Sequence, residues 1–449
     1  MPKWRWFMMQ MARRLWVKAT LIGALGILAA VFAAYAERFI PWTVPGTIGA
    51  DSVQSLLTII ASSMLAVTTF SLSIMVSAYG AATTNVTPRA TKLLVEDRLA
   101  QNVLATFLGS FLFSIVGLIV LKTGAYGESG RAVLFVMTVA VIAMVVVALI
   151  RWIDHLTKLG RVGETTSRVE GAAQAALETR LCDPFLGGTP WYDPDERIPL
   201  DVVAVMLGTI GYVQHIDMRA LSRICDVHGI DIYIKAVPGI FVYPQVPLVW
   251  ITRPEGDADL DKVSEAVRRA FSLGDERAYD QDPRFGLAVM AEIGARALPP
   301  AANNPGTAID IIGRQTRLLS IWAKGAPDGQ SAKEPLYGRV HVPPILPADL
   351  FEDSFMLMAR DGAGLIEVQL RIQKSLLALS QIGDAAFREA ALHQSRMAFA
   401  RAEAALSYEE DKERLRAFVT SGKDAACGTM RKRIPVSASC GQSITPMDH

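Results

Sequence analysis

Four long segments without charged residues dominate the first third of the chain, and short polar or charged stretches separate them. Because the hydrocarbon core of a bilayer is roughly 30 Å thick, about 20 helical residues are needed to cross it. Each segment comes close to or exceeds that length, and none shows the alternation of a barrel strand. The pattern therefore predicts four transmembrane helices, at residues 19–36, 53–79, 99–121 and 132–150.

The second apolar segment carries a row of small and hydroxyl side chains at steps of three or four residues. At about 100° per residue, this spacing places them on one face of a helix. The row, which we call the hydroxyl stripe, consists of Ser55, Thr58, Ser62, Ala66, Thr69, Ser73 and Ser77. One interpretation is a packing face, because small residues let membrane helices approach closely. The other is a polar path that several copies of this helix line together.

Basic residues flank the four segments unevenly. They gather before the first segment, between the second and third, and after the fourth, which by the positive-inside rule predicts that both termini are cytoplasmic. The first segment ends in Ala34-Tyr35-Ala36, which resembles the cleavage site of a secretory signal, and cleavage there would leave the other three spans unchanged. No charged residue lies inside any segment, which argues against a pump.

The residues that follow the second segment predict the cytoplasmic mouth of a path along the stripe. Asn85, Thr87 and Arg89 lie there, and Thr87-Pro88 is typical of the start of a short helix. A helix N-terminus beside Arg89 would favour anions. The alternative is an ordinary interfacial helix whose Arg89 extends to lipid phosphates.

Composition divides the chain into the same two parts. Residues 1–155 hold 12 of the 45 Lys and Arg residues and 6 of the 44 Asp and Glu residues, for a net charge of +6. The other 294 residues hold 33 and 38, for a net charge of −5, with the composition of an ordinary globular domain. This division excludes a simple soluble enzyme, a disordered chain and a nucleic-acid binder that works through bulk charge.

The second part predicts a cytoplasmic domain. Helix, strand and turn signals indicate a helical stalk and linker at 156–199, a small β-rich module at 200–252, a helical domain at 253–420 and a disordered tail at 421–449. The predicted fold class is an α-helical integral membrane protein with four transmembrane helices and a C-terminal α+β cytoplasmic domain, mostly helical with a small β-rich module. The four cysteines are scattered, and free thiols are the default for a cytosolic domain.

Motifs of known chemistry do not point to a reaction. The sequence has no phosphate-cradling loop, nucleophile elbow or H-E-x-x-H motif, so we assign no catalytic residue, cofactor or metal. Cys225-x-x-His228 with His215 and Asp217 matches no standard zinc spacing, and a packed helix is favoured. Another polar cluster predicts either a turn that caps two helices or a small-molecule regulatory site. It consists of Arg277, Gln281, Asp282, Arg296, Asn303 and Asn304.

Several motifs, spread over nearly the whole chain, resemble one known family. They are Thr87-Pro88-Arg89, Asp97 and Gln101 before Phe107 and Phe111, Gly211-Tyr212-Val213-Gln214-His215-Ile216-Asp217, Pro238-Gly239-Ile240-Phe241-Val242, Gln281-Asp282-Pro283-Arg284-Phe285-Gly286, and Arg296-Ala297-Leu298 with Asn303-Asn304-Pro305-Gly306-Thr307-Ala308. In this order they are similar to the bacterial predicted membrane proteins grouped as domain of unknown function 2254. The resemblance implies a multi-span protein of the bacterial cytoplasmic (inner) membrane with a cytosolic domain, and it implies no activity. Asn304 and Ile240 stand where the family favours acidic residues, which argues against a carboxylate cation site here.

Two functional hypotheses follow. The first is a homo-oligomeric channel or facilitator for a small ion or solute, in which the second span lines the path and the cytosolic domain assembles or gates the oligomer. The second is a membrane-anchored sensor or scaffold that transports nothing and acts through its cytosolic domain. The expected partners are the lipid bilayer and further copies of the chain, with no nucleic acid and no cofactor.

Overall fold

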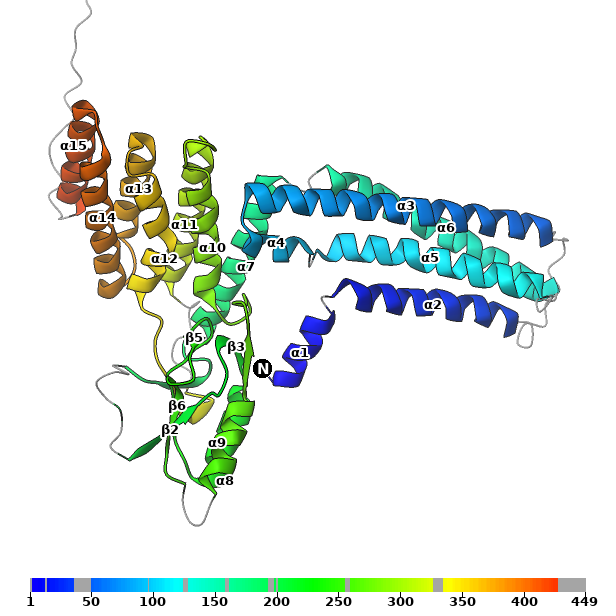
Figure 1. The fold of residues 1–449 in the computed structure, drawn as a ribbon, viewed down its shortest axis with the longest axis horizontal. Coiled ribbons are helices and arrows are strands. Elements are labelled where there is room, and N and C mark those ends of the chain that lie inside the picture. The colour runs from blue at the N-terminus through cyan, green and yellow to red at the C-terminus, as the bar shows by residue number, and fades with distance from the viewer. Residues whose placement is uncertain are drawn as a thin grey trace, which may run out of the picture.

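The computed structural model of the chain is mostly helical, with a bundle of long helices at one end and a second body of shorter helices and strands at the other (Figure 1). We call residues 161–426, which form that second body, the C-terminal region. The structure describes residues 2–12, 14–35, 50–95, 97–123, 128–157, 161–192, 198, 201–254, 259–325 and 334–426.

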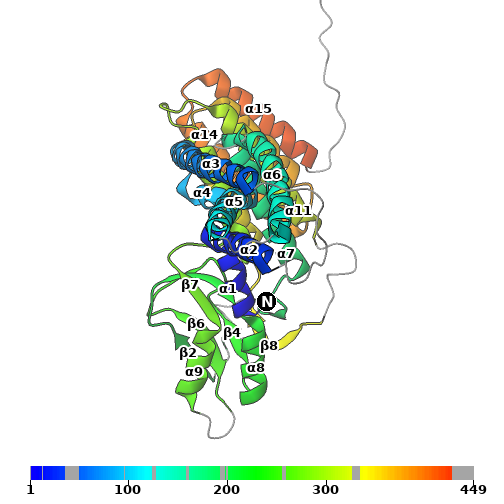
Figure 2. The ribbon, with the colours of Figure 1, turned by 90° about the vertical axis from the view of Figure 1, so that its right-hand side faces the viewer.

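Four long helices form the bundle, and α5 lies at its centre. They are α2 (Leu15–Tyr35), α3 (Ala50–Asn85), α5 (Arg98–Lys122) and α6 (Glu128–Leu156). Figure 2, which looks along the bundle, shows the other three around α5. Phe107 of α5 packs in one buried cluster with Met64 of α3 and Val145 of α6. Phe113 packs in a second cluster with Leu57 of α3, so that apolar side chains join the helices along their length.

Among the described residues, three helices are long and apolar enough to cross a membrane: Asp51–Ala81 within α3, Arg98–Lys122 and Gly130–Leu156 within α6. The segment predicted at 19–36 is matched by α2, which meets the same criterion only together with α1 (Lys3–Ala12), at a bend of 70°. α3 and α6 run beyond their predicted ends at 79 and 150. α6 therefore carries Arg151, Asp154 and His155 in its last turns.

Small residues bring α2 and α5 close together. A Cβ on Gly26 would lie 2.7 Å from the carbonyl oxygen of Gly109, and a Cβ on Gly109 would lie 2.7 Å from Cγ2 of Ile22. Gly23 faces Leu112 in the same way, at 2.8 Å. Close approach of this kind, through glycine faces, is a common means of helix packing in membranes.

Within the described residues, seven helices make up the larger part of the C-terminal region. They are α7 (Val162–Cys182), α10 (Pro283–Arg296), α11 (Pro305–Lys324), α12 (Pro347–Asp361), α13 (Ile366–Leu379), α14 (Ala385–Ala405) and α15 (Glu409–Ala426). α10, α11 and α12 begin at a proline, whose fixed φ suits the first turn and whose missing amide is not needed there. Asp282 and Asn304 cap α10 and α11 by accepting hydrogen bonds from the backbone amides of Phe285 and Thr307.

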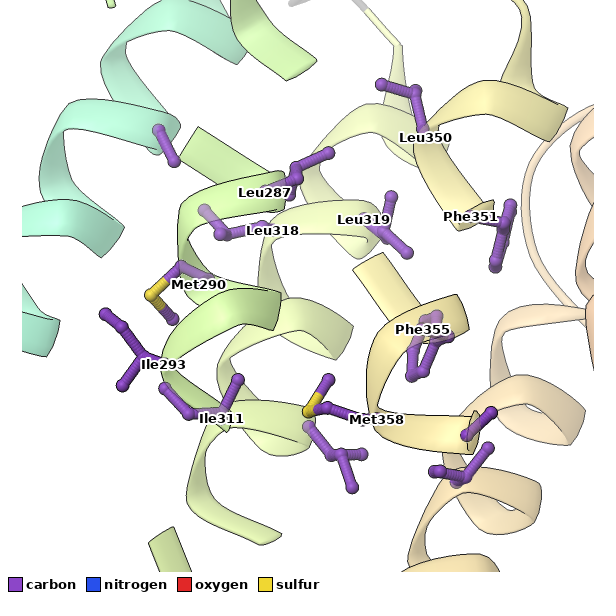
Figure 3. Packing of buried hydrophobic residues seen from close by; sticks show 14 of the residues in the cluster. Leu287, Met290, Ile293, Ile311, Leu318, Leu319, Leu350, Phe351, Phe355 and Met358 are labelled. Carbon is purple, nitrogen blue, oxygen red and sulfur yellow. The ribbon is translucent and has the colours of Figure 1, made fainter. Parts of the chain in front are cut away.

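The main core of this region lies between α10, α11 and α12. Figure 3 shows Leu287 of α10, Leu319 of α11, and Phe355 and Met358 of α12 together in this core, all buried. Burial of one such side chain contributes roughly 1.5–3 kcal/mol. The helical part therefore has a core of its own, separate from that of the bundle.

The strands form a compact sheet module beside the helices. The module contains β1 (Gly188–Pro190), β2 (Val202–Met206), β3 (Gly211–Ile216), α8 (Met218–His228), β4 (Ile232–Ile234), β5 (Phe241–Val242), β6 (Pro247–Thr252), α9 (Leu260–Arg269), β7 (Phe271–Gly274) and β8 (Tyr337–Val342). One sheet has the strand order β1-β8-β4-β6-β2 and the other the order β5-β3-β7. β8 lies between β1 and β4 and pairs in parallel with both.

The structure differs from the predicted boundaries of the β-rich module, 200–252. β1 lies in the predicted stalk and linker, 156–199, and β7 and β8 lie in the segment 253–420, which was predicted to be helical. These strands are short or flanked by prolines, so that their sequences carry little periodicity, and pairing with distant strands determines their structure. α15 continues to Ala426, into the predicted tail, and residues 427–449 lie outside the described residues.

Gly26→Ala should destabilise the bundle, because the new methyl group would overlap the Gly109 carbonyl and force α2 and α5 apart. Overpacking of this kind costs about 1–3 kcal/mol. Gly80→Ala in α3 is a matched control, since no described atom lies within 4 Å of a Cβ there. Thermal unfolding of the purified protein in detergent should give a lower Tm for the first variant only, and equal values would contradict this packing.

Candidate functional site

The bundle and the C-terminal region meet at a junction built from segments far apart in the sequence. α1, α4 (Pro88–Val95), the end of α6, α7, β3 and the loop before α10 come together there (Figures 1 and 2). Charged and polar side chains connect these segments to one another. We therefore treat the junction as the candidate functional site.

Asp97 joins three helices at the junction. Its carboxylate caps α5 by accepting hydrogen bonds from the backbone amides of Leu99 and Ala100, at 2.8 and 3.3 Å. Oδ2 of the same carboxylate lies 2.7 Å from Nε2 of His155, at the end of α6, and 2.8 Å from the guanidinium of Arg168, on α7. The Asp97 side chain is only 5% exposed.

The electrostatics of this cluster favour an ionised Asp97. Burial alone would raise the pKa of Asp97, but the hydrogen bond to His155 and the charge of Arg168 outweigh it and lower the pKa to about 2. An ionised carboxylate accepts on both oxygens, as the contacts to three helices require. The cluster therefore holds the start of α5, the end of α6 and α7 in one arrangement.

The helix that follows the hydroxyl stripe docks on α10. Thr87 Oγ1 accepts a hydrogen bond from the backbone amide of Arg89, at 3.4 Å, as expected of a cap for α4. Thr87 Oγ1 also donates to Oε2 of Glu292 at 3.1 Å, and Arg89 forms an ion pair with the same carboxylate. Val86 and Ala90 are fully buried in the core of the helical part. The segment that directly follows α3 is thus part of that core.

These contacts place two of the three predicted mouth residues against α10. Thr87 is buried, and Arg89 is paired with a carboxylate, which compensates the positive charge on which an anion site would depend. The side chain of Asn85 lies outside the described part of the chain. The predicted mouth is therefore a contact between the bundle and the C-terminal region.

A second charged pair ties the start of α10 to the sheet module. Asp282 accepts two hydrogen bonds from Arg277, from Nε at 2.7 Å and from a terminal guanidinium nitrogen at 2.9 Å. Gly239 lies against this carboxylate with a φ of +95°, and any Cβ there would overlap the Asp282 oxygens. Burial raises the pKa of Asp282, and the bonds from Arg277 act against the rise.

Arg180, at the end of α7, extends this polar group. It donates to the backbone oxygen of Gln281 at 3.2 Å, and the side-chain oxygen of Gln281 accepts from the backbone amide of Ile216 at 3.0 Å. Burial lowers the pKa of Arg180 to about 10, and the charge of Asp282 acts against this, so that the guanidinium remains protonated near neutral pH. α7, α10 and β3 are in this way joined by hydrogen bonds.

The predicted polar cluster is consequently divided between the two ends of α10. Arg277, Gln281 and Asp282 lie together at its start, whereas Arg296 is its last residue and the Asn303-Asn304 turn follows. At 1.5 Å per residue, the 14 residues of α10 separate the two groups by about 20 Å. Asn304 caps α11, which agrees with the interpretation of this turn as a helix cap.

α1 is fastened to the sheet module by its first residue. The backbone nitrogen of Lys3 donates to Oδ2 of Asp217 at 2.6 Å, and Asp217 in turn caps α8. Nζ of Lys3 donates to the carbonyl oxygens of Arg269 and Phe271, at 2.9 and 2.8 Å. These bonds attach α1 to the ends of β3 and α9 and to the start of β7.

Trp6 is the buried anchor of α1. Its indole nitrogen donates to Oδ2 of Asp280 at 3.1 Å, and its ring stacks on His215 of β3 with the centroids 5.1 Å apart. Burial lowers the pKa of His215 to about 4, so that the ring is neutral near pH 7. The two rings line a cavity of about 360 Å³ between α1, α7 and β3, to which Arg180 also contributes.

The Cys225-x-x-His228 motif lies in α8, and Cys225 is buried in the packing of that helix. Its sulfur contacts the backbone oxygen of Arg339 at 3.7 Å, and burial raises its pKa to about 12. His215 stacks on Trp6, and Asp217 bonds Lys3. Within the described residues, no group of three or more His, Cys, Asp or Glu side chains is placed to hold a metal ion.

The hydroxyl stripe lies on the outward surface of α3. All seven of its residues are exposed, whereas Leu57, Ile60 and Met64 on the other side of the helix pack into the bundle. Four hydroxyls of the stripe donate to backbone oxygens of the preceding turn, at 2.8–3.1 Å; they belong to Thr58, Ser62, Thr69 and Ser77. The stripe is therefore not a packing face within a single chain.

No sequence motif assigns His155, Arg168, Glu292 or Trp6 to a site. His155 lies just beyond the predicted end of the fourth span, outside the apolar run. The predicted topology is compatible with a contact between Asp97 and His155, because the start of the third span and the end of the fourth are predicted to lie on the same side of the membrane. Glu292 lies in the middle of an amphipathic helix, and no local pattern marks its partner.

Comparison with known proteins shows that the chain is similar to predicted membrane proteins. A family model described as "Predicted membrane protein (DUF2254)" matches residues 12–378. The chain is 25% identical over 279 residues to the uncharacterized proteins Mb1321c of Mycobacterium bovis and Rv1290c of Mycobacterium tuberculosis, covering 61% of this chain and 53% of each relative. The chain thus spans about half the length of these relatives. No solved structure matches.

Asp97→Asn should lower the stability of the full chain in detergent. The amide can still cap α5, but it removes the charge with which His155 and Arg168 pair. A carboxyl pKa lowered to about 2 corresponds to about 2 kcal/mol of stability at neutral pH. Thermal unfolding should show this loss as a lower Tm.

The loss should also depend on pH. Because the pKa of Asp97 is lower in the folded than in the unfolded chain, its contribution is complete above about pH 5 and disappears as the pH falls toward 2. The Tm difference between wild type and Asp97→Asn should therefore shrink below about pH 4. Glu164→Gln is the control, since Glu164 pairs with the same Arg168 but is 34% exposed. An equal loss of Tm in both variants would contradict the stabilising role of the buried Asp97 charge.

Proposed function

We propose that this chain, which belongs to the DUF2254 family of predicted membrane proteins, acts in the bilayer as a homo-oligomeric channel or facilitator. Several copies of α3 line a polar path with their hydroxyl stripes. The C-terminal region assembles the oligomer or gates the path. The permeant is a small ion or solute.

The outward position of the hydroxyl stripe carries this proposal. Exposed apolar side chains border the stripe on both sides of the helix, with Ile59 and Phe70 on one side and Leu65 and Leu72 on the other. A row of hydroxyls between two apolar borders suits a helix that contacts neighbouring copies at its borders and faces a shared polar path between them. Lipid alone would favour a uniformly apolar surface.

The hydroxyl groups suit the lining of such a path. Each hydroxyl that donates to its own helix keeps oxygen lone pairs that face away from the backbone. A row of such oxygens can replace part of the hydration shell of a small ion or solute. The helix loses no backbone bond in the process, because the hydroxyls add to carbonyls that already accept within the helix.

The contact between Lys3 and Asp217 supports four spans with both termini on one side. The N-terminus and the C-terminal region can touch only if the chain crosses the membrane an even number of times between them. α2, α3, α5 and α6 give four crossings, with α2 as the first. The basic flanks favour the cytoplasm of a bacterial inner membrane as that side.

Replacement of stripe hydroxyls should reduce conduction. In planar bilayers, Ser62→Leu and Thr69→Leu should roughly halve or abolish the unitary conductance of the purified oligomer, because a bulky apolar side chain narrows and dries the path. Ile59→Leu, on the exposed border of the same helix, should conduct like the wild type. Conductance that is the same in all three variants would contradict the proposed lining.

Silent bilayers with a correctly assembled oligomer would exclude the channel. The remaining hypothesis would then be the sensor or scaffold, which requires a reproducible protein partner whose binding is lost when residues 160–420 are deleted. Oligomer assembly is measured on the same preparation by native mass spectrometry.

The docking of α4 on α10 predicts a gating contact. Arg89→Glu places two carboxylates together in the Arg89–Glu292 pair, so it should change the open probability and leave the unitary conductance unchanged. The exchange Arg89→Glu with Glu292→Arg should restore the wild-type open probability. Arg388→Glu, exposed on α14, is the control for the change in net charge. An open probability that is unaffected by Arg89→Glu would contradict a role of this contact in gating.

A further inference from the structure

The two faces of α1 differ sharply in what they contact. Trp6 is 6% exposed and packs on the sheet module, where Lys3 also bonds. On the other side of the helix, Trp4, Phe7 and Met8 are 63%, 59% and 60% exposed. At about 100° per residue, these three fall within one arc that faces away from Trp6. The exposed arc of this short helix is therefore aromatic and apolar.

The direction of α1 places this arc beside the bilayer. α1 and α2 are bent by 70° at their break, so a helix α2 that stands along the membrane normal leaves α1 roughly 20° from the membrane plane. Figure 1 shows α1 beside the sheet module, at the level where the bundle begins. The exposed arc thus lies close to the start of α2.

Nearby charges indicate the kind of surface that α1 contacts. Arg5 on α1 and Arg14 at the break are exposed, and Lys18 follows one turn into α2. Helices that lie in a membrane interface combine Trp, Phe and other apolar side chains on one face with basic side chains that attract anionic lipid. Trp4 and Phe7 border an open groove against Phe271 and Leu273 of β7, but more than half of each side chain stays exposed.

We propose that α1 lies in the headgroup region of a bilayer that contains anionic lipid, with Trp4, Phe7 and Met8 in the acyl boundary, and that it holds the sheet module against the membrane surface. The inference rests on α2 crossing the membrane, as in the proposed function, but not on conduction. It assigns to the N-terminal helix a membrane contact that the sheet module shares through Lys3 and Trp6.

The contacts of α1 make this attachment specific. Lys3 bonds Asp217, which caps α8, and the backbone oxygens at the start of β7 and the end of α9. Trp6 bonds Asp280 and stacks on His215 of β3. A displacement of α1 in the interface therefore moves the central strand β3 and the edge strand β7 of the three-stranded sheet. The membrane surface determines in this way where the sheet module sits relative to the bundle.

Photo-crosslinking of the full chain tests the proposal. The photoreactive residue p-benzoylphenylalanine replaces Phe7 in one variant, Met9 in a second and Val227 in a third, and each protein is reconstituted in vesicles of phosphatidylcholine and phosphatidylglycerol. Phe7→p-benzoylphenylalanine should gain a lipid adduct on irradiation, seen by mass spectrometry. Met9 is less exposed, at 39%, and lines the cavity beside Trp6, so its variant should crosslink mainly within the chain. Val227 is 75% exposed on α8, in the sheet module, and controls for random encounter with lipid.

The outcomes separate the alternatives. A lipid adduct at position 7 that is absent at positions 9 and 227 supports the proposal. A crosslinked dimer at position 7 would show that a second copy covers the arc, and a lipid adduct no more abundant than at 227 would place the arc in water; both overturn it. Because Phe7 is exposed, its replacement leaves the packing of Trp6 intact. The bilayer recordings that test conduction are independent of each of these results.

Discussion

The buried carboxylate of Asp97 is the constraint on which the arrangement of the whole molecule depends. An ionised group that is 5% exposed must be surrounded by donors, and here they come from the start of α5, the end of α6 and α7. Removal of one partner from such a group is costly, since the remaining charge stays buried without compensation. The bundle therefore cannot rotate freely against α7, and α7 in turn packs on α10 and α11.

Two further contacts connect the bundle to the C-terminal region, one on each side of this cluster. On one, α3 continues through Val86 into α4, so that the end of the stripe helix is part of the helical core. On the other, α1 joins α2 to the sheet module. The helical part and the sheet module are thus each tied to a different helix of the bundle. Any relative motion of α2 and α3 becomes a relative motion of the two halves of the C-terminal region.

The sequence predicts those features that local patterns encode. Apolar length identifies the long helices, and Thr87-Pro88 and Asn304-Pro305 identify the starts of α4 and α11, because capping depends on neighbouring residues. The sequence does not predict that β8 pairs with β4 or that Glu292 forms an ion pair with Arg89. Both contacts depend on residues that only the complete fold brings together. The outward direction of the hydroxyl stripe belongs to the same class: periodicity shows that a face exists, and packing determines which side of it is covered.

The place of β8 in the sheet has a consequence for synthesis of the chain. β8 separates β1 from β4, yet it is made after α10 and α11, more than 100 residues after β4. Until then the edge of β4 has no partner on that side, and an unpaired edge strand readily joins strands of other chains. Because domains form as the chain emerges, the sheet module must wait, partly assembled, while the helices beside it fold. A chain that ends before residue 337 would therefore have an open sheet, with the edge of β4 available to strands of other chains.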